Sequence, residues 1–145
     1  MTLLSTLDGS MQAMHPFLPA KDFQQSLRFY EDLGFRAQLF GDELAQMHFG
    51  LDFSFLLQDH YVEQWADNFM MQVIVRDVRA WWNHIASLKL VEKYGVRPPR
   101  APTLEASWEL TVAYVFDPSG VLWHFAEPTA PKSPDSAAGE KLIRH

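Results

Sequence analysis

Histidine is the residue type through which this chain could do most chemistry, because the sequence holds six histidines and no cysteine. Disulfides, thiolate zinc sites and thiol nucleophiles are therefore excluded, and any metal would need histidine, carboxylate or amide ligands. Two histidines stand at marked places. His15 precedes the predicted helix cap Asp22, and His124 follows a predicted turn that ends at Gly120. Each imidazole could bind a divalent metal or act as a neutral hydrogen-bonding group that titrates near neutral pH.

The segment 116–128, FDPSGVLWHFAEP, is the clearest local pattern in the chain. Its Asp-Pro-Ser-Gly run predicts a turn, since proline fixes φ at the second turn position and glycine tolerates a positive φ at the exit. A strand should follow, with side chains alternating between its faces. His124 is then expected on the face opposite Trp123, and Glu127 on the same face as Trp123.

Apolar periodicity and turn residues predict the elements that carry these histidines. Asp22 and Asp77 each precede apolar residues at helical spacing and are good helix caps, and Gly34 should end the first helix. Alternating or short apolar runs predict strands at 14–20, 35–40, 44–49, 51–58 and 69–75, with further strands leading to His124.

The order of elements recurs. Superposing Asp22 on Asp77 also matches Lys21 with Arg76, Leu33 with Leu88 and Phe35 with Leu90. We therefore expect an α+β protein of two β-α-β-β-β modules, each with a half-covered sheet, that share a core. The predicted organisation is a lead-in (1–13), a first module (14–58), a connector (59–68), a second module (69–128) and a flexible tail (129–145).

Net charge and composition exclude several classes of binding partner. The net charge is −6 with a pI near 5.4, which argues against binding to nucleic acid or to an anionic membrane. No apolar run approaches the roughly 20 residues that span a bilayer, and the first residues lack the pattern of a signal peptide. The sequence predicts a cytoplasmic protein whose partner is a small molecule.

Three segments together resemble the vicinal oxygen chelate superfamily, which includes glyoxalase I, extradiol dioxygenases and the fosfomycin and bleomycin resistance proteins. They are LPAKDFQQSLRFYEDLGF, VIVRDVRAWWNHI and DPSGVLWHFAEP. The resemblance implies paired modules that form a curled mixed sheet around a cavity. It also implies a homodimer, and leaves open whether modules are exchanged between chains.

The same resemblance implies four metal-ligand positions. His15 falls at the first and His124 at the fourth, while the third offers Gln72 and the second, within 54–58, shows no carboxylate. Two hypotheses follow. The chain is a small-molecule-binding protein of the bleomycin resistance type, or a lyase, isomerase or dioxygenase that uses His15 and His124 with zinc, nickel, manganese or iron.

Three further residues are candidates for ligand contact. His48 has no matching ligand role in the family and is expected on a strand beside the cavity or at its rim. Trp65 lies in the polar connector, and Trp108 follows a proline-rich stretch where family members place loops at the cavity mouth. With His15 and His124, these residues make up the predicted ligand-binding set. For Trp108, ligand contact and ordinary packing remain alternatives.

Overall fold

The computed structural model describes residues 7–129. The first module forms a four-stranded sheet in the order β1-β4-β3-β2, in which β1 runs parallel to β4 and the other neighbours are antiparallel. Its elements are β1 (Phe17–Pro19), α2 (Phe23–Leu33), β2 (Arg36–Leu39), β3 (Leu44–Phe49) and β4 (Phe53–Gln58).

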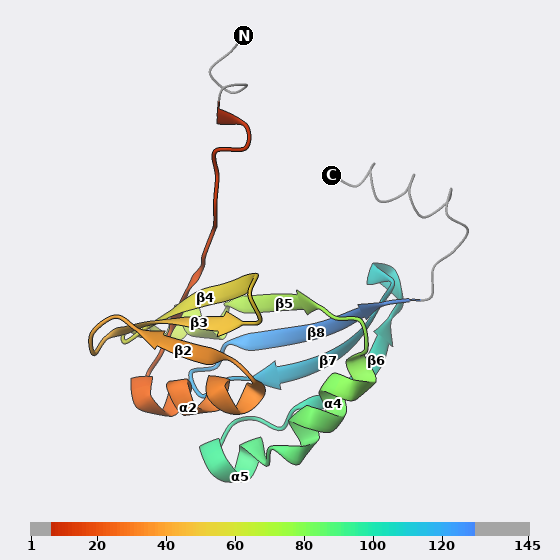
Figure 1. The fold of residues 1–145 in the computed structure, drawn as a ribbon. Helices are drawn as coiled ribbons and strands as arrows, with labels where there is room; N and C mark the ends of the chain where they lie inside the picture. The colour runs from red at the N-terminus through yellow and green to blue at the C-terminus, as the bar shows by residue number, and fades with distance from the viewer. Residues whose placement is uncertain (1–6, 130–145) are drawn as a thin grey trace.

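The second module repeats this plan, with the strand order β5-β8-β7-β6 and a parallel β5–β8 pair. Two four-stranded mixed sheets with their helices in an open, curled arrangement confirm the predicted fold class (Figure 1). The remaining elements are α3 (Glu63–Asp67), β5 (Met70–Ile74), α4 (Val78–Ser87), α5 (Leu90–Tyr94), β6 (Arg100–Glu105), the 3-10 turn η1 (Ala106–Trp108), β7 (Leu110–Phe116) and β8 (Leu122–Pro128).

Both long helices begin and end as their sequences require. The carboxylates of Asp22 and Asp77 accept hydrogen bonds from backbone N–H groups three residues later, at 3.1 and 3.0 Å. Each bond satisfies one N–H group of the first helical turn that has no acceptor within the helix. Helix α2 ends at Gly34, whose φ of 121° is unfavourable for residues with a side chain.

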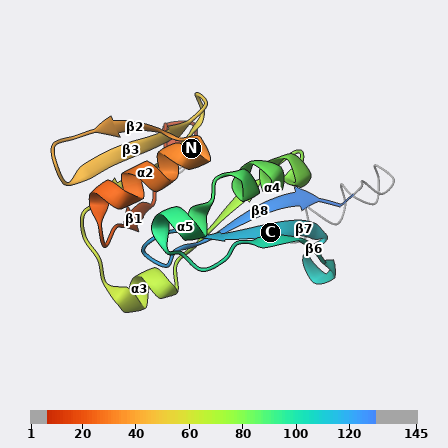
Figure 2. The ribbon, with the colours of Figure 1, turned by 90° about the horizontal axis from the view of Figure 1, so that it is seen from below.

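The helices lie on one side of the sheets, and the core fills the space between them (Figures 1 and 2). The largest fully buried side chains include Phe29, Tyr30, Phe55, Trp123 and Phe125, so both modules contribute to one core. None of the helices α2, α4 and α5 covers the other face of either sheet. Its apolar residues Phe17, Met70 and Ile74 remain 51, 61 and 55% exposed.

The structure differs from the sequence prediction in three segments. The later part of the proline-rich stretch before Trp108 forms strand β6. This strand tolerates Pro102 because it is the edge of its sheet and its pairing with β7 is irregular between Arg100 and Thr103. The connector contains the short helix α3, and α5 follows α4 where no helix was predicted. Of the predicted lead-in and tail, residues 1–6 and 130–145 lie outside the described part.

Candidate functional site

The turn before β8 holds the two modules together. Asp117 accepts backbone hydrogen bonds from Ser119 and Val121 on Oδ1, at 2.8 and 2.9 Å. Its Oδ2 accepts the hydroxyl of Tyr30 on α2, at 2.5 Å, and that hydroxyl accepts the indole N–H of Trp123 at 2.9 Å. This buried network fixes the start of β8 against the helix of the first module, and so fixes the strand that carries the candidate histidine.

Burial decides the protonation of this network. Removal from water raises the pKa of Asp117 to about 6, although the Tyr30 hydroxyl and the backbone N–H groups favour its charged form. Burial and the neighbouring carboxylate also hold the pKa of Tyr30 well above its usual value. Tyr30 therefore remains a donor at neutral pH, as the hydrogen bond to Asp117 requires.

His124 lies on the uncovered side of the second sheet, as the alternation of β8 predicts. Its ring stacks on Trp108, with centroids 6.0 Å apart and planes 26° apart. Tyr114, its partner on β7, meets the same imidazole edge to face, with the two ring centroids 4.9 Å apart. His124 is only 9% exposed, and its Nε2 is buried without a hydrogen-bond partner among the described residues. Such an orphaned buried nitrogen is costly unless another molecule satisfies it.

The charges around His124 favour a neutral imidazole beside a carboxylate. Burial lowers the pKa of His124, and the nearby Glu105 opposes this shift in part. The Glu105 carboxylate accepts the hydroxyl of Tyr114 at 2.9 Å. Burial and this hydrogen bond raise the pKa of Tyr114, so its phenol stays protonated. The cluster of Glu105, Trp108, Tyr114 and His124 is called the His124 cluster below.

The His124 cluster combines a flat aromatic surface with two polar positions. Trp108 is half-exposed, so one part of its indole is open to solvent while another covers the imidazole. A planar ligand could stack on such a surface, and its polar groups could meet the imidazole nitrogen and the carboxylate.

The other predicted histidines belong to the first module, His48 on β3 and His15 just before β1. His15 Nε2 and the Ser54 hydroxyl share a hydrogen bond of 3.0 Å, and the same hydroxyl accepts the Gln46 amide at 3.0 Å. His48 Nε2 is 2.8 Å from the Gln38 amide oxygen. Ser54 pairs with His48 across the β3–β4 ladder, so these polar groups share one uncovered face.

The predicted site residues thus fall into separate groups. Trp108 and His124 are in contact, whereas His15 and His48 belong to the face of the other module. Trp65 is 71% exposed on α3, which lies apart from β6 (Figure 2). Tyr114 was missed by the sequence reasoning, although strand alternation and the pairing of β7 with β8 would have placed it beside His124.

The residues of the described chain do not fit a metal site within one copy. No three histidine, aspartate or glutamate side chains in 7–129 gather closely enough to hold a metal ion. Gln72 is the register partner of His124 on β5, and Glu105 is already bonded to Tyr114. Glu127, on the helix side of β8, accepts the first backbone N–H of α4 at 2.9 Å.

Solved structures with the same architecture include antibiotic-binding proteins. A bleomycin-binding protein complexed with bleomycin shares 25% identity with a TM-score of 0.67, over 81% of this chain and 98% of that protein. The bleomycin resistance determinant encoded on transposon Tn5 shares 24% identity with a TM-score of 0.69, over 83% and 100% of the two chains.

The chain has the vicinal oxygen chelate fold. The same fold is found in a lactoylglutathione lyase from Agrobacterium tumefaciens, at 18% identity and a TM-score of 0.59, over 80% of this chain and 92% of that one. Neither a protein-family model nor the sequence of a curated protein matches the chain. Binding proteins and an enzyme therefore share this vicinal oxygen chelate fold, and its function here depends on the residues of the site. Within residues 7–129, no helix is long and apolar enough to cross a membrane.

Proposed function

We propose that the chain binds a small, flat molecule on the uncovered face of its second sheet, against the His124 cluster. The observation that carries the proposal is the buried Nε2 of His124, which lacks a hydrogen-bond partner among the described residues. A ligand that shifts the Trp108 ring would reach and satisfy this nitrogen, while its own ring would stack on the exposed part of that indole. The similar solved structures include a bleomycin-binding protein in complex with bleomycin, which supports the same class of function.

The ligand should carry a hydrogen-bond donor or a positive charge. Glu105 places a carboxylate beside His124, and the imidazole is neutral near pH 7 because burial lowers its pKa. The His124 cluster therefore has a net negative charge. A ligand with protonated nitrogens is complementary to that charge, whereas an anionic ligand would be repelled by the Glu105 carboxylate.

A second copy of the chain is proposed as the cover of this face. Phe17, Met70 and Ile74 are more than half exposed on the uncovered faces, and apolar side chains on a sheet face favour burial against another surface. In such a dimer, the polar face around His15 and His48 of one copy would lie within reach of the His124 cluster of the other copy. The cavity would then lie between modules, as predicted from the sequence.

The dimer is tested by sedimentation velocity on Met70→Glu. This variant places a charge on the uncovered face, at an apolar position that is 61% exposed, and should sediment as a monomer. Leu51→Glu is the matched control, since Leu51 is 97% exposed at the β3–β4 turn; it should sediment like the unmodified protein. A monomer before any substitution, or a dimer that tolerates Met70→Glu, would refute the second copy as cover.

Ligand binding is tested by titration calorimetry with metal-free bleomycin and with a panel of flat heteroaromatic amines and acids. Saturable binding of an amine, weakened roughly ten-fold or more in Trp108→Ala and His124→Ala, is expected. Trp65→Ala removes an exposed tryptophan outside the His124 cluster and should leave the affinity unchanged. The proposal fails if no panel member binds, or if Trp65→Ala weakens binding as much as the two site variants.

The metal-dependent alternative has no comparable support within one copy, because the described residues gather no third ligand beside His124. Its test is metal analysis of protein made without a polyhistidine tag. One equivalent of zinc, nickel, manganese or iron, lost in both His15→Ala and His124→Ala, would favour the enzyme over the binding protein.

A further inference from the structure

A separate hollow of about 330 Å³ lies where the helices of the two modules meet. It is lined by Gln25, Arg28 and Asp32 on α2 and by Lys93 and Tyr94 on α5. The three α2 residues are three and four positions apart, so they share one face of the helix. This volume is at the lower end for small-molecule sites, which favours a small ligand. The hollow is on the helix side of the sheets and is distinct from the His124 cluster.

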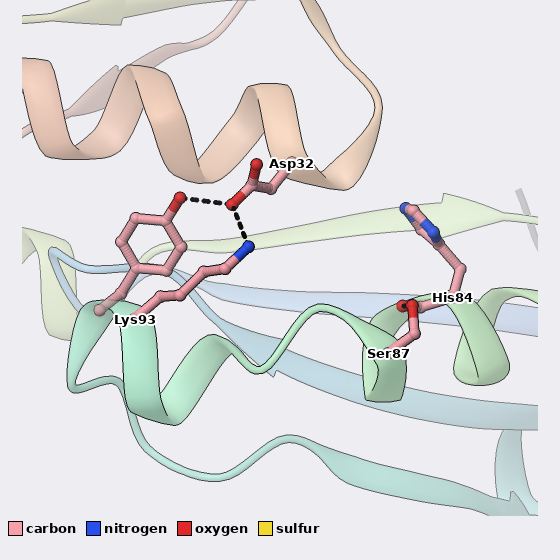
Figure 3. A network of polar contacts seen from close by, with 5 residues as sticks. Asp32, His84, Ser87 and Lys93 are labelled. Carbon is pink, nitrogen blue, oxygen red and sulfur yellow. Dashed lines mark hydrogen bonds and ion pairs between the residues drawn. The ribbon is translucent and has the colours of Figure 1, made fainter.

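The one carboxylate in its lining already has two donors. Asp32 Oδ2 accepts the Tyr94 hydroxyl at 2.5 Å and the Lys93 ammonium at 3.4 Å (Figure 3). Burial, and then the bond to Asp32, hold the pKa of Tyr94 far above neutral, so the phenol keeps its proton. These contacts join α2 to α5 and reduce the repulsion that Asp32 would exert on an incoming anion.

The remaining donors of the hollow are unoccupied by the described chain. Within residues 7–129, the Arg28 guanidinium and the Gln25 side-chain amide have no hydrogen-bond or ion-pair partner, whereas Lys93 makes only its long contact to Asp32. Arg28 and Lys93 outweigh Asp32 by one positive charge. Glu31 also acts on Tyr94 but does not line the hollow. The lining of the hollow therefore carries a charge opposite in sign to the net charge of the protein, which is −6.

We propose that the hollow binds a small organic oxyanion, a carboxylate or a phosphate monoester, with the charged group between Arg28 and Lys93. Guanidinium groups bind such oxyanions in a bidentate manner, and an ammonium adds a second charge-assisted hydrogen bond. The body of the ligand would lie against Tyr94. Because Arg28 belongs to the first module and Lys93 to the second, the bound anion connects the modules. This site goes beyond the proposed function and stands independently of it.

Binding is measured by NMR titration of the full chain with phenyl phosphate, inorganic phosphate, benzoate and acetate, against chloride at constant ionic strength. Saturable shifts confined to α2 and α5 amides are expected. Arg28→Gln and Lys93→Gln should each weaken binding about ten-fold, since each removes one charge-assisted hydrogen bond. Arg79→Gln is the matched control, because Arg79 is an exposed arginine of α4 outside the hollow. It should leave the affinity unchanged.

The four probes identify the chemistry of the ligand. Tighter binding of phenyl phosphate than of benzoate assigns a phosphate monoester, and the reverse order assigns a carboxylate. The proposal is overturned if no probe saturates, if the shifts spread over the whole surface, or if Arg79→Gln weakens binding as much as Arg28→Gln. Arg28 and Lys93 are exposed, so the two variants should fold like the unmodified protein. Circular dichroism checks this.

Discussion

Replacing Tyr30 by phenylalanine removes one oxygen from the centre of the joint between the modules. That oxygen accepts the indole N–H of Trp123 and donates to the carboxylate of Asp117. The variant leaves a buried indole donor unsatisfied, at a cost of about 1–3 kcal/mol, and removes a hydrogen bond to a charged group worth about 1.5–3 kcal/mol. Since the two effects share one oxygen, we expect a loss of about 2–4 kcal/mol in the free energy of unfolding.

The pH dependence of this loss follows from the titration of Asp117. Its pKa is raised from 3.8 to about 6 in the folded state, so the folded protein binds this proton more tightly than the unfolded chain. The resulting contribution to stability is present below pH 3.8 and is lost as the pH rises through 6, by about 3 kcal/mol in all. Because the Tyr30 hydroxyl lowers this pKa, Tyr30→Phe should raise it further and extend the loss to higher pH.

Urea unfolding followed by far-ultraviolet circular dichroism, at about pH 4.5 and about pH 8, measures both effects. Tyr30→Phe should cost more at the higher pH, where Asp117 is ionised in the unmodified protein. Tyr61→Phe is the control, since no described residue bonds to that hydroxyl, and it should change little at either pH. Equal losses for Tyr30→Phe at the two pH values would refute the assignment of Asp117 as the group that titrates in the joint.

Three further measurements test separate features of the fold and the site. Asp22→Ala and Asp77→Ala should each lower the free energy of unfolding by about 1 kcal/mol through loss of a helix cap, as measured by urea unfolding; unchanged stability would contradict the capping role. Gly34→Ala should cost more than 1 kcal/mol in the same assay, because φ is 121° and a Cβ would meet the Phe49 ring at 3.0 Å. Glu105→Gln should lower the pKa of His124 in an NMR titration, since the carboxylate raises it; an upward shift would contradict this.

Local rules explain why much of the fold could be predicted from the sequence. The helix caps at Asp22 and Asp77, the glycine end of α2 and the turn at Asp117 each depend on residues within a few positions of one another. The orientation of His124 depends only on the two-residue alternation of a strand. These features depend on residues that are close in the sequence, and the structure confirms them.

The features that could not be predicted depend on contacts between distant residues. Pro102 suggested a loop, and only the position of β6 at the edge of its sheet makes a strand compatible with it. Tyr114 is beside His124 through the register of β7 with β8. His15 bonds to Ser54, which is 39 positions away, so its environment could not be read from neighbouring residues.

The joint between the modules and the candidate site each include one of two consecutive residues of β8. Trp123 points to the core and bonds to Tyr30, while His124 points to the uncovered face and stacks on Trp108. A shift of β8 along its axis would therefore move both groups together. Because Asp117 holds the start of this strand with three hydrogen bonds, a change in its protonation should alter the position of the His124 imidazole as well as the stability of the fold. The affinity of the proposed ligand should consequently follow the titration of two groups, His124 at the surface of the site and Asp117 in the core behind it.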